Sequence, residues 1–295
     1  MLNDFIAVYE GAPLLFQIFA FVFGAIVGSF LNVCIYRIPA KKSIVSPGST
    51  CACGKPIAWY ENIPILSWFI LRGKARCCGQ SYSFRYPFIE LLAGLLFLAA
   101  WITQDPAKAG CIMVFISMLI CASFIDFDHM EIPDRFSLGL AFTGVVLSVI
   151  VPSLHGISHP VYMIASMQSL IESLIGVLVG SGIILWLALV AEIILRKEAM
   201  GFGDVKLLGG IGAFTGWQGS VFALLGGSVI GLFGLCIWML VKQIMPSLRK
   251  SEDDGQLFGK HTPFGPMLSA GAIVYFLLAE DAVNDYFEMF ASIVY

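Results

Sequence analysis

Long runs of apolar residues, separated by short polar segments, limit this chain more than any other feature of its sequence. Most of the runs reach about 17 to 25 residues, which is the length that an α-helix needs to cross a bilayer. They do not alternate between apolar and polar residues as membrane strands do. With a mean hydropathy of +0.87 and 13% charged residues, the composition excludes a soluble globular domain. The sequence therefore predicts an all-α polytopic membrane protein with about eight transmembrane helices.

Prolines, glycines and charged residues mark the ends of the expected helices. The sixth helix is short and rich in glycine, and residues 215–219 after it predict a turn. In chain order, the expected helices cover about residues 13–36, 86–102, 110–125, 136–151, 170–195, 207–214, 220–241 and 263–279.

The 17 basic residues are grouped between the expected helices. Eight lie from Arg37 to Arg85, and a later group lies from Lys242 to Lys260. Because basic residues favour the cytoplasmic side of a membrane, this grouping predicts that both chain termini lie outside the cytoplasm. Membrane lipids are the expected surroundings. We expect no nucleic-acid partner, and the oligomeric state is not predicted.

A polar segment, residues 39–85, separates the first two expected helices. It divides the chain into residues 1–38 with the first helix, the segment itself, and a membrane domain of residues 86–295. So short a segment buries little apolar core, so we expect a metal ion or the membrane domain to stabilise it. We therefore expect a small cysteine-containing cytoplasmic domain there.

Four of the eight cysteines lie in this segment, as the close pairs Cys51 with Cys53 and Cys77 with Cys78. Four thiolates can hold one zinc ion tetrahedrally, and the reducing cytoplasm disfavours disulfides. The pairs are spaced Cys-x-Cys and Cys-Cys, whereas zinc knuckles usually have Cys-x-x-Cys. The sequence thus predicts one zinc ion, with four free or redox-sensitive thiols as the alternative.

Two aspartates at the ends of membrane helices are the candidate catalytic groups. Asp204 follows Gly201 and Gly203, which leave the acid unshielded and allow an extended peptide to approach. Asp126 directly follows the third apolar run. Two acids that share a proton can hydrolyse a peptide, one polarising the carbonyl and the other taking a proton from water. The pair therefore predicts an aspartyl protease.

Each candidate acid has an alternative interpretation. Asp204 could cap the sixth helix, as Asp134 could cap the fourth. Asp128 is the reserve partner for Asp204, but a continuing helix would turn it about 200° away from Asp126.

Several segments together carry a resemblance to a known family. The chain resembles the bacterial type IV prepilin peptidases, which combine leader peptidase and N-methyltransferase activities in type IV pilus and type II secretion systems. The resemblance rests on residues 28–33, 36–39, 59–64 within the cysteine segment, 71–74, 126–134 and 201–206.

The resemblance implies a site and a reaction. Asp126 and Asp204 would be the catalytic pair of a GxGD-type aspartyl protease, with Gly201 and Gly203 shaping the site. The enzyme would remove the basic leader of prepilins or pseudopilins at the cytoplasmic face of the bacterial inner membrane, with both its own termini periplasmic. It would then methylate the new N-terminal residue, usually Phe, with S-adenosylmethionine. Within the cysteine segment, the candidates for binding this cofactor are Glu61, Asn62 and Gly73.

Three other functions fit parts of the pattern. A peptidase without methyltransferase activity would have no evident use for residues 39–85. A proton- or ion-coupled transporter predicts acids near the bilayer midplane and an internal repeat. A structural secretion subunit would leave the two aspartates unexplained.

Overall fold

The computed structural model describes residues 11–294 except residues 52, 197–200 and 245–262. The described part of the chain is helical, with two isolated β-bridges, so the predicted all-α fold is confirmed. Most of the expected basic loop from Lys242 to Lys260 lies outside the described residues. The longer elements are α2 (Pro13–Arg37), α4 (Arg85–Thr103), α5 (Pro106–His129), α6 (Asp134–Ile150), α7 (Tyr162–Leu195), α8 (Phe202–Ile244), α9 (Gly265–Val274) and α10 (Glu280–Val294). The short elements are η1 (Trp59–Asn62), α3 (Leu66–Ile70), η2 (Pro152–His155) and the π-helical segment η4 (Tyr275–Ala279).

Among the described residues, six helical stretches are long and apolar enough to cross a membrane. They are α2, α4, α5, α7, α8 and the joined helices from Gly265 to Phe290. The 17-residue α6 is shorter than these stretches. The prediction of a multi-spanning membrane protein is confirmed, whereas the count of eight spans stays a prediction.

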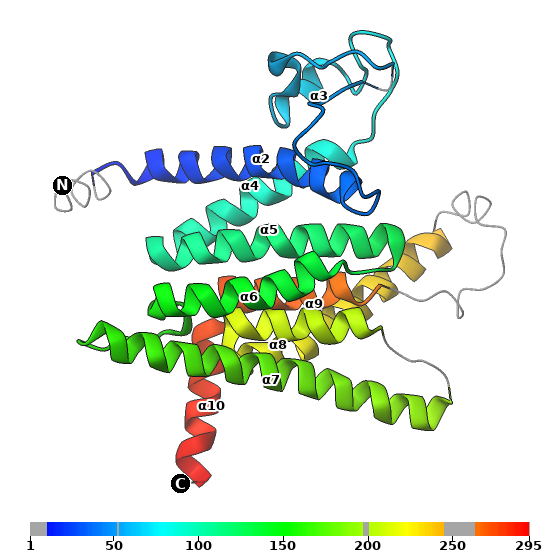
Figure 1. Cartoon of the computed structure of the whole chain (residues 1–295). Helices are drawn as coiled ribbons and strands as arrows, with labels where there is room; N and C mark the ends of the chain where they lie inside the picture. Colours follow the sequence, from blue (N-terminus) through cyan, green and yellow to red (C-terminus); the bar gives the residue numbers. More distant parts are fainter. Residues whose placement is uncertain (1–10, 52, 197–200, 245–262, 295) are drawn as a thin grey trace. The chain divides into compact units, whose positions relative to one another are not determined.

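The chain forms two compact units, Met1–Cys121 and Ala122–Tyr295, and the division falls within α5. In the first unit, α2 and α4 lie side by side (Figure 1). Glycines allow the close approach, because a Cβ added at Gly28 would lie 2.8 Å from the Glu90 Cα. The buried amide of Asn32 donates a hydrogen bond to the Tyr86 carbonyl at 3.2 Å, which links the cytoplasmic ends expected for both helices.

In the second unit, α7 packs along α8 with very little space between their backbones (Figure 1). A Cβ added at Gly176 would meet the Gly212 carbonyl oxygen, and one added at Gly180 would lie 2.5 Å from the Leu208 carbonyl oxygen. The Ser173 hydroxyl donates a hydrogen bond to the Ala213 carbonyl at 2.8 Å. Small residues therefore let these two helices approach closely in antiparallel register.

The helix labelled α8 consists of two arms that meet at Gly216, where φ is 69° and ψ is -174°. A Cβ added at Gly212 would lie 2.5 Å from the Ser220 hydroxyl oxygen. In a straight helix, residues eight apart are about 12 Å apart, so the chain must turn back at Gly216. This agrees with the turn that the sequence predicts at residues 215–219, although the first arm begins at Phe202 rather than at residue 207.

Several expected boundaries were wrong because helices continue through polar residues. The third helix runs from Pro106 to His129, so Asp126 lies inside its final turns rather than after its end. Asp134 does not cap α6, because Pro133 holds the N-cap position and Asp134 is the first helical residue. The helix α7 begins at Tyr162, eight residues earlier than expected.

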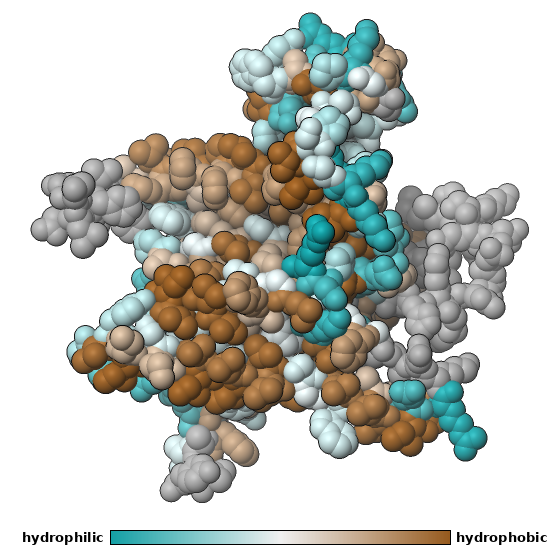
Figure 2. Space-filling view, viewed as in Figure 1, coloured by the Kyte–Doolittle hydropathy of each residue, from teal (hydrophilic) through white to brown (hydrophobic). Residues whose placement is uncertain are grey.

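Surface hydropathy separates the membrane helices from the cysteine segment. Figure 2 shows hydrophobic side chains over the visible faces of α2 and α7, and mostly hydrophilic or neutral ones over the segment between α2 and α4. The described surface thus agrees with a membrane domain that carries a small polar domain.

Candidate functional site

Asp126 and Asp204 lie at the same end of the second unit. Asp126 is in the last turns of α5, which ends where Met130 takes a positive φ of 55° and its amide binds the Asp126 carbonyl at 2.9 Å. Asp204 is in the first turn of α8, where its amide binds the Gly201 carbonyl at 3.1 Å. The chain therefore presents both acids from helix ends, as the sequence predicts.

The Asp126 side chain is held in place by a residue that lies 139 positions later in the chain. It is only 6% exposed, and its Oδ2 accepts a hydrogen bond of 3.1 Å from the amide of Gly265. Gly265 is the first residue of α9, so the carboxylate lies at a helix N-terminus, where the backbone dipole favours a negative charge. Asp128, two residues further along α5, is exposed. This difference in burial favours Asp126 over Asp128 as the functional acid.

Ile132 lies between the glycines that flank the two acids. Its Cβ would be 3.4 Å from a Cβ added at Gly203, and its Cδ1 would be 3.0 Å from one added at Gly265. A Cβ at Gly201 would lie 3.8 Å from the Asp204 Oδ2. Ile132 thus reaches both Gly265, whose amide binds Asp126, and Gly203, which precedes Asp204. The described residues thus bring both acids and both glycines to one place.

An ion pair connects the two helices that begin beside the site. The Lys206 ammonium lies 2.6 Å from Asp134 Oδ1, and it also lies 5.3 Å from the centre of the Phe202 ring. Lys206 is two residues after Asp204, and Asp134 is two residues after Ile132. The pair therefore joins the start of α8 to the start of α6 next to the carboxylates.

Sequence reasoning missed Gly265 and Ile132 as parts of this site. Pro266 predicts a helix start at Gly265, because proline favours the first turn of a helix. No sequence signal connects that start to Asp126, which lies 139 residues earlier. Ile132 gives no polar signal at all, since its contribution is the shape of its side chain.

The four cysteines of residues 39–85 also come together. The sulfur atoms of Cys51 and Cys78 are 3.5 Å apart, those of Cys53 and Cys77 are 3.3 Å apart, and all four lie within 4.8 Å of one another. A tetrahedral zinc site with Zn–S bonds of about 2.3 Å has sulfur atoms about 3.8 Å apart. The cluster can therefore hold one metal ion, despite its unusual spacing in the sequence.

Two similar turns present the cysteine pairs. In the first, the Cys51 amide binds the Lys55 carbonyl at 2.8 Å, and Gly54 has a φ of 84°. In the second, the Ala75 amide binds the Gln80 carbonyl at 2.8 Å, and Gly79 has a φ of 70°. Each turn needs one residue in the left-handed conformation, which glycine adopts without strain.

Hydrogen bonds within the cluster separate the acidities of its thiols. The backbone amide of Cys53, together with the Cys77 and Cys78 side chains, lowers the pKa of Cys51 to about 7. Hydrogen bonds to Cys51 and Cys53 raise the pKa of Cys77 to about 12. The Cys51 thiol is thus ready to bind a metal near neutral pH, whereas the metal must displace a proton from Cys77.

The residues proposed for the methyl donor are spread over the same segment. Glu61 in η1 lies 3.7 Å from the Arg76 guanidinium, which ties η1 to the second cysteine turn. Gly73 has a φ of 67°, and a Cβ added there would lie 3.0 Å from the Trp68 ring. Asn62 follows Glu61 in η1. All three residues therefore lie in the segment that also holds the cysteine cluster.

Two protein-family models match this chain, one over the cysteine segment and one over the aspartates. The model of the Bacterial Peptidase A24 N-terminal domain matches residues 22–104, and the model of the Type IV leader peptidase family matches residues 113–236. The first of these covers the cysteine cluster, and the second covers both aspartates. No solved structure matches the chain.

Curated relatives cover most of the chain. A Prepilin leader peptidase/N-methyltransferase of Aeromonas hydrophila is 31% identical over 95% of this chain and 97% of its own length. A Type 4 prepilin-like proteins leader peptide-processing enzyme of Escherichia coli is 33% identical over 90% of this chain and 95% of its own length. A Prepilin leader peptidase/N-methyltransferase of Myxococcus xanthus is 40% identical over 75% of this chain and 64% of its own length. The resemblance predicted from the sequence motifs is confirmed, and this chain belongs to the type IV leader peptidase family.

Proposed function

We propose that this protein is a bacterial inner-membrane enzyme that removes the leader of type IV prepilins or type II secretion pseudopilins and then N-methylates the new N-terminus. The observation that carries the peptidase proposal is the meeting of Asp126 and Asp204 around Ile132. Membership of the family, and the names of its relatives, support both activities.

The two carboxylates would have different roles. The Oδ2 of Asp126 already accepts a hydrogen bond from the Gly265 amide. The other carboxylate oxygen of Asp126 is therefore the one that would take a proton from water. Asp204 would hold a proton and donate a hydrogen bond to the peptide carbonyl oxygen. The water oxygen then attacks the carbonyl carbon, the C–N bond breaks, and the leaving amine takes up the proton from Asp126. Gly201 and Gly203 would keep the approach to Asp204 free of side chains.

The cysteine cluster would hold one zinc ion through Cys51, Cys53, Cys77 and Cys78. Zinc held by four thiolates would act structurally, because no coordination position remains open for a substrate. It would fix the two turns of residues 39–85, a segment too short to bury a large apolar core of its own. We propose this segment as the domain associated with methyl transfer from S-adenosylmethionine, with Glu61, Asn62 and Gly73 as its candidate binding residues.

The charge distribution supports a topology for this enzyme. The eight basic residues from Arg37 to Arg85 would hold the cysteine segment in the cytoplasm, and the aspartates would face the same compartment. Both termini would then be periplasmic. In this arrangement the basic leader of the substrate stays in the cytoplasm, where the two carboxylates can reach it.

The test uses purified protein in detergent with a model prepilin and S-adenosylmethionine, followed by intact mass. Asp126→Asn and Asp204→Asn should each abolish leader removal while methylation of a pre-cut substrate continues. Asp128→Asn is the matched control and should retain cleavage. Cleavage that survives either of the first two substitutions would overturn the catalytic assignment. A wild-type protein that cleaves the leader without methylating the product would be a peptidase that lacks methyltransferase activity.

A further inference from the structure

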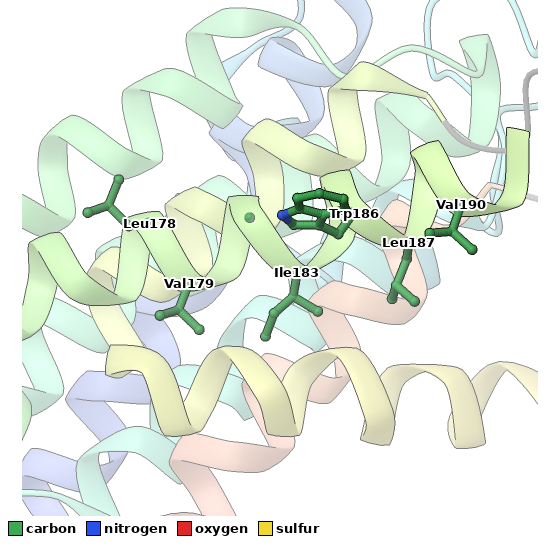
Figure 3. A pocket seen from close by; sticks show the side chains of 7 residues that line it. Leu178, Val179, Ile183, Trp186, Leu187 and Val190 are labelled. Carbon is green, nitrogen blue, oxygen red and sulfur yellow. The ribbon is translucent and has the colours of Figure 1, made fainter. Parts of the chain in front are cut away.

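The side of α7 that carries Leu178, Trp186 and Val190 is exposed and apolar (Figure 3). Lipid chains are as apolar as these side chains, so a membrane-spanning helix needs no other partner there. By contrast, a polar contact in the first unit joins the membrane helices to the cysteine segment. The Glu90 carboxylate of α4 accepts a hydrogen bond of 2.7 Å from the backbone amide of Ile65.

The backbone of Ile65 is strained. Its φ of 65° and ψ of -56° place it at the centre of a γ-turn, in which the Leu66 amide binds the Pro64 carbonyl at 2.6 Å. This form of the γ-turn is rare, and a β-branched residue with a positive φ is an outlier. Such a conformation persists only where the surrounding structure holds it, and it is most frequent at functional sites. The contact that holds Ile65 therefore bears on function.

The Glu90 carboxylate is well placed to hold this turn. A carboxylate binds a backbone amide more strongly than a neutral oxygen acceptor does. Glu90 lies in the second turn of α4, where a Cβ added at Gly28 of α2 would be 2.8 Å from the Glu90 Cα. Two closely packed membrane helices therefore fix the position of the acceptor. The turn at Ile65 is thus bound to the α2–α4 pair and not only to its own segment.

The γ-turn connects η1 to α3. The Ser67 hydroxyl of α3 donates a hydrogen bond of 3.4 Å to the Tyr60 carbonyl of η1, so the two short helices are held together across the turn. Two of the candidate methyl-donor residues, Glu61 and Asn62, belong to η1. The Glu90 contact therefore sets where these two side chains lie relative to the membrane helices.

The third candidate, Gly73, is connected to the same turn through α3. A Cβ added at Gly73 would be 3.0 Å from the ring of Trp68, which belongs to α3. The Trp68 indole donates a hydrogen bond of 3.3 Å to the Tyr82 carbonyl, and the Tyr82 amide binds the Gly73 carbonyl at 2.9 Å. The γ-turn, α3 and Gly73 thus form one connected series of contacts that begins at Glu90.

We propose that Glu90 is a positioning residue for the N-methyltransferase reaction, which holds the γ-turn at Ile65 on the membrane helices and thereby places the candidate methyl-donor residues. This inference rests on the proposed methyltransferase function. The methyl group must reach an amine that leader removal produces at the membrane face, so the donor needs a fixed position relative to the membrane helices. A carboxylate from α4 supplies that fixed point, and proximity lowers a barrier only when the reacting groups are held in place.

Hydrogen exchange tests the contact in the full-length protein without requiring activity. Glu90→Leu should speed exchange of the Ile65 amide at least tenfold, measured by mass spectrometry on a peptide that covers residues 63–67. Glu192→Leu makes the same change at an exposed carboxylate of α7 and should leave this exchange at the wild-type rate. An unchanged rate in Glu90→Leu would overturn the proposal.

Methylation of a pre-cut pilin gives the functional test. Glu90→Leu should raise the KM for S-adenosylmethionine at least tenfold, and leader cleavage by the same preparation should stay within twofold of the wild-type rate. Glu90→Gln keeps an oxygen acceptor and should give a KM between those of the wild type and Glu90→Leu. Equal losses of cleavage and methylation, or an unchanged KM in Glu90→Leu, would overturn the positioning role.

Glycine at position 65 separates positioning from a loss of folding. Because glycine adopts a positive φ without strain, Ile65→Gly makes the turn less dependent on the carboxylate. The double variant of Glu90→Leu with Ile65→Gly should therefore have a KM at least threefold lower than that of Glu90→Leu alone. A double variant that is no better than Glu90→Leu would contradict the positioning role. A wild-type protein that methylates no pre-cut pilin would remove the proposed methyltransferase function, and this inference with it.

Discussion

The backbone amide of Gly265 donates a hydrogen bond of 3.1 Å to the carboxylate of Asp126. An added Cβ at Gly265 would lie 2.7 Å from the same carboxylate oxygen, so only glycine allows this approach. The first residue of α9 therefore fixes the position of an acid at the end of α5. This relationship makes α9 a part of the candidate active site.

Gly265→Ala should lower kcat for leader cleavage by about 100-fold, because its methyl group displaces the Asp126 carboxylate by roughly 1 Å. The measurement is single-turnover cleavage of a model prepilin, with thermal unfolding recorded alongside. Gly110→Ala, also in a membrane helix but with nothing within 4 Å of an added Cβ, should retain full activity. An active Gly265→Ala enzyme would show that the position of Asp126 does not depend on this contact.

Lys206→Met should reduce cleavage about three- to tenfold, because it releases the start of α8 from Asp134 beside the catalytic pair. Asp134→Asn should have a similar effect. The side chains are 26% and 62% exposed, so the pair contributes less than about 1 kcal/mol to folding and the variants should unfold near the wild-type temperature. A double-mutant cycle should show that the two effects are coupled. Additive effects would mean that the ion pair does not position Asp204.

Zinc affinity should rise steeply between pH 6 and pH 8. The thiol of Cys51, with its pKa lowered to about 7, loses its proton in this range, and the metal must displace a proton from Cys77, whose pKa is raised to about 12. Because binding releases protons, a higher pH favours it. Competition with a chromophoric chelator measures the affinity. Cys77→Ser should weaken binding, and Cys236→Ser, which alters an exposed cysteine of α8, should not. A pH-independent affinity would contradict a thiolate site.

Gly176→Val should lower the unfolding temperature by about 4 to 10 °C, because the added side chain meets the backbone of α8 at Gly212. Gly182→Val on the same helix is the control, since its new side chain meets nothing within 4 Å. Differential scanning fluorimetry in detergent compares the two variants. Equal unfolding temperatures would show that α7 and α8 can separate at no cost.

Hydrophobic run length predicted the helices well, because a membrane span depends on length and apolarity alone. It predicted their ends poorly. The third helix continues through Asp126 and Asp128 to His129, since hydrogen bonds within the helix do not stop where the side chains become polar. Asp134 was expected as a cap, but it is the first helical residue after Pro133, and its carboxylate pairs with Lys206, which lies 72 residues away in the chain.

The sequence by itself determined the class of protein, and it predicted the candidate site residues, namely the two aspartates with their glycines and the four cysteines, because each follows from local composition, motif or spacing. It left the metal geometry open, since the pairs Cys51 with Cys53 and Cys77 with Cys78 do not have the usual spacing. Only the tertiary structure brought their sulfur atoms within 4.8 Å of one another. Only the tertiary structure placed Gly265 against Asp126. These contacts join residues far apart in the chain, and helix packing, rather than any local pattern, decides which of them meet.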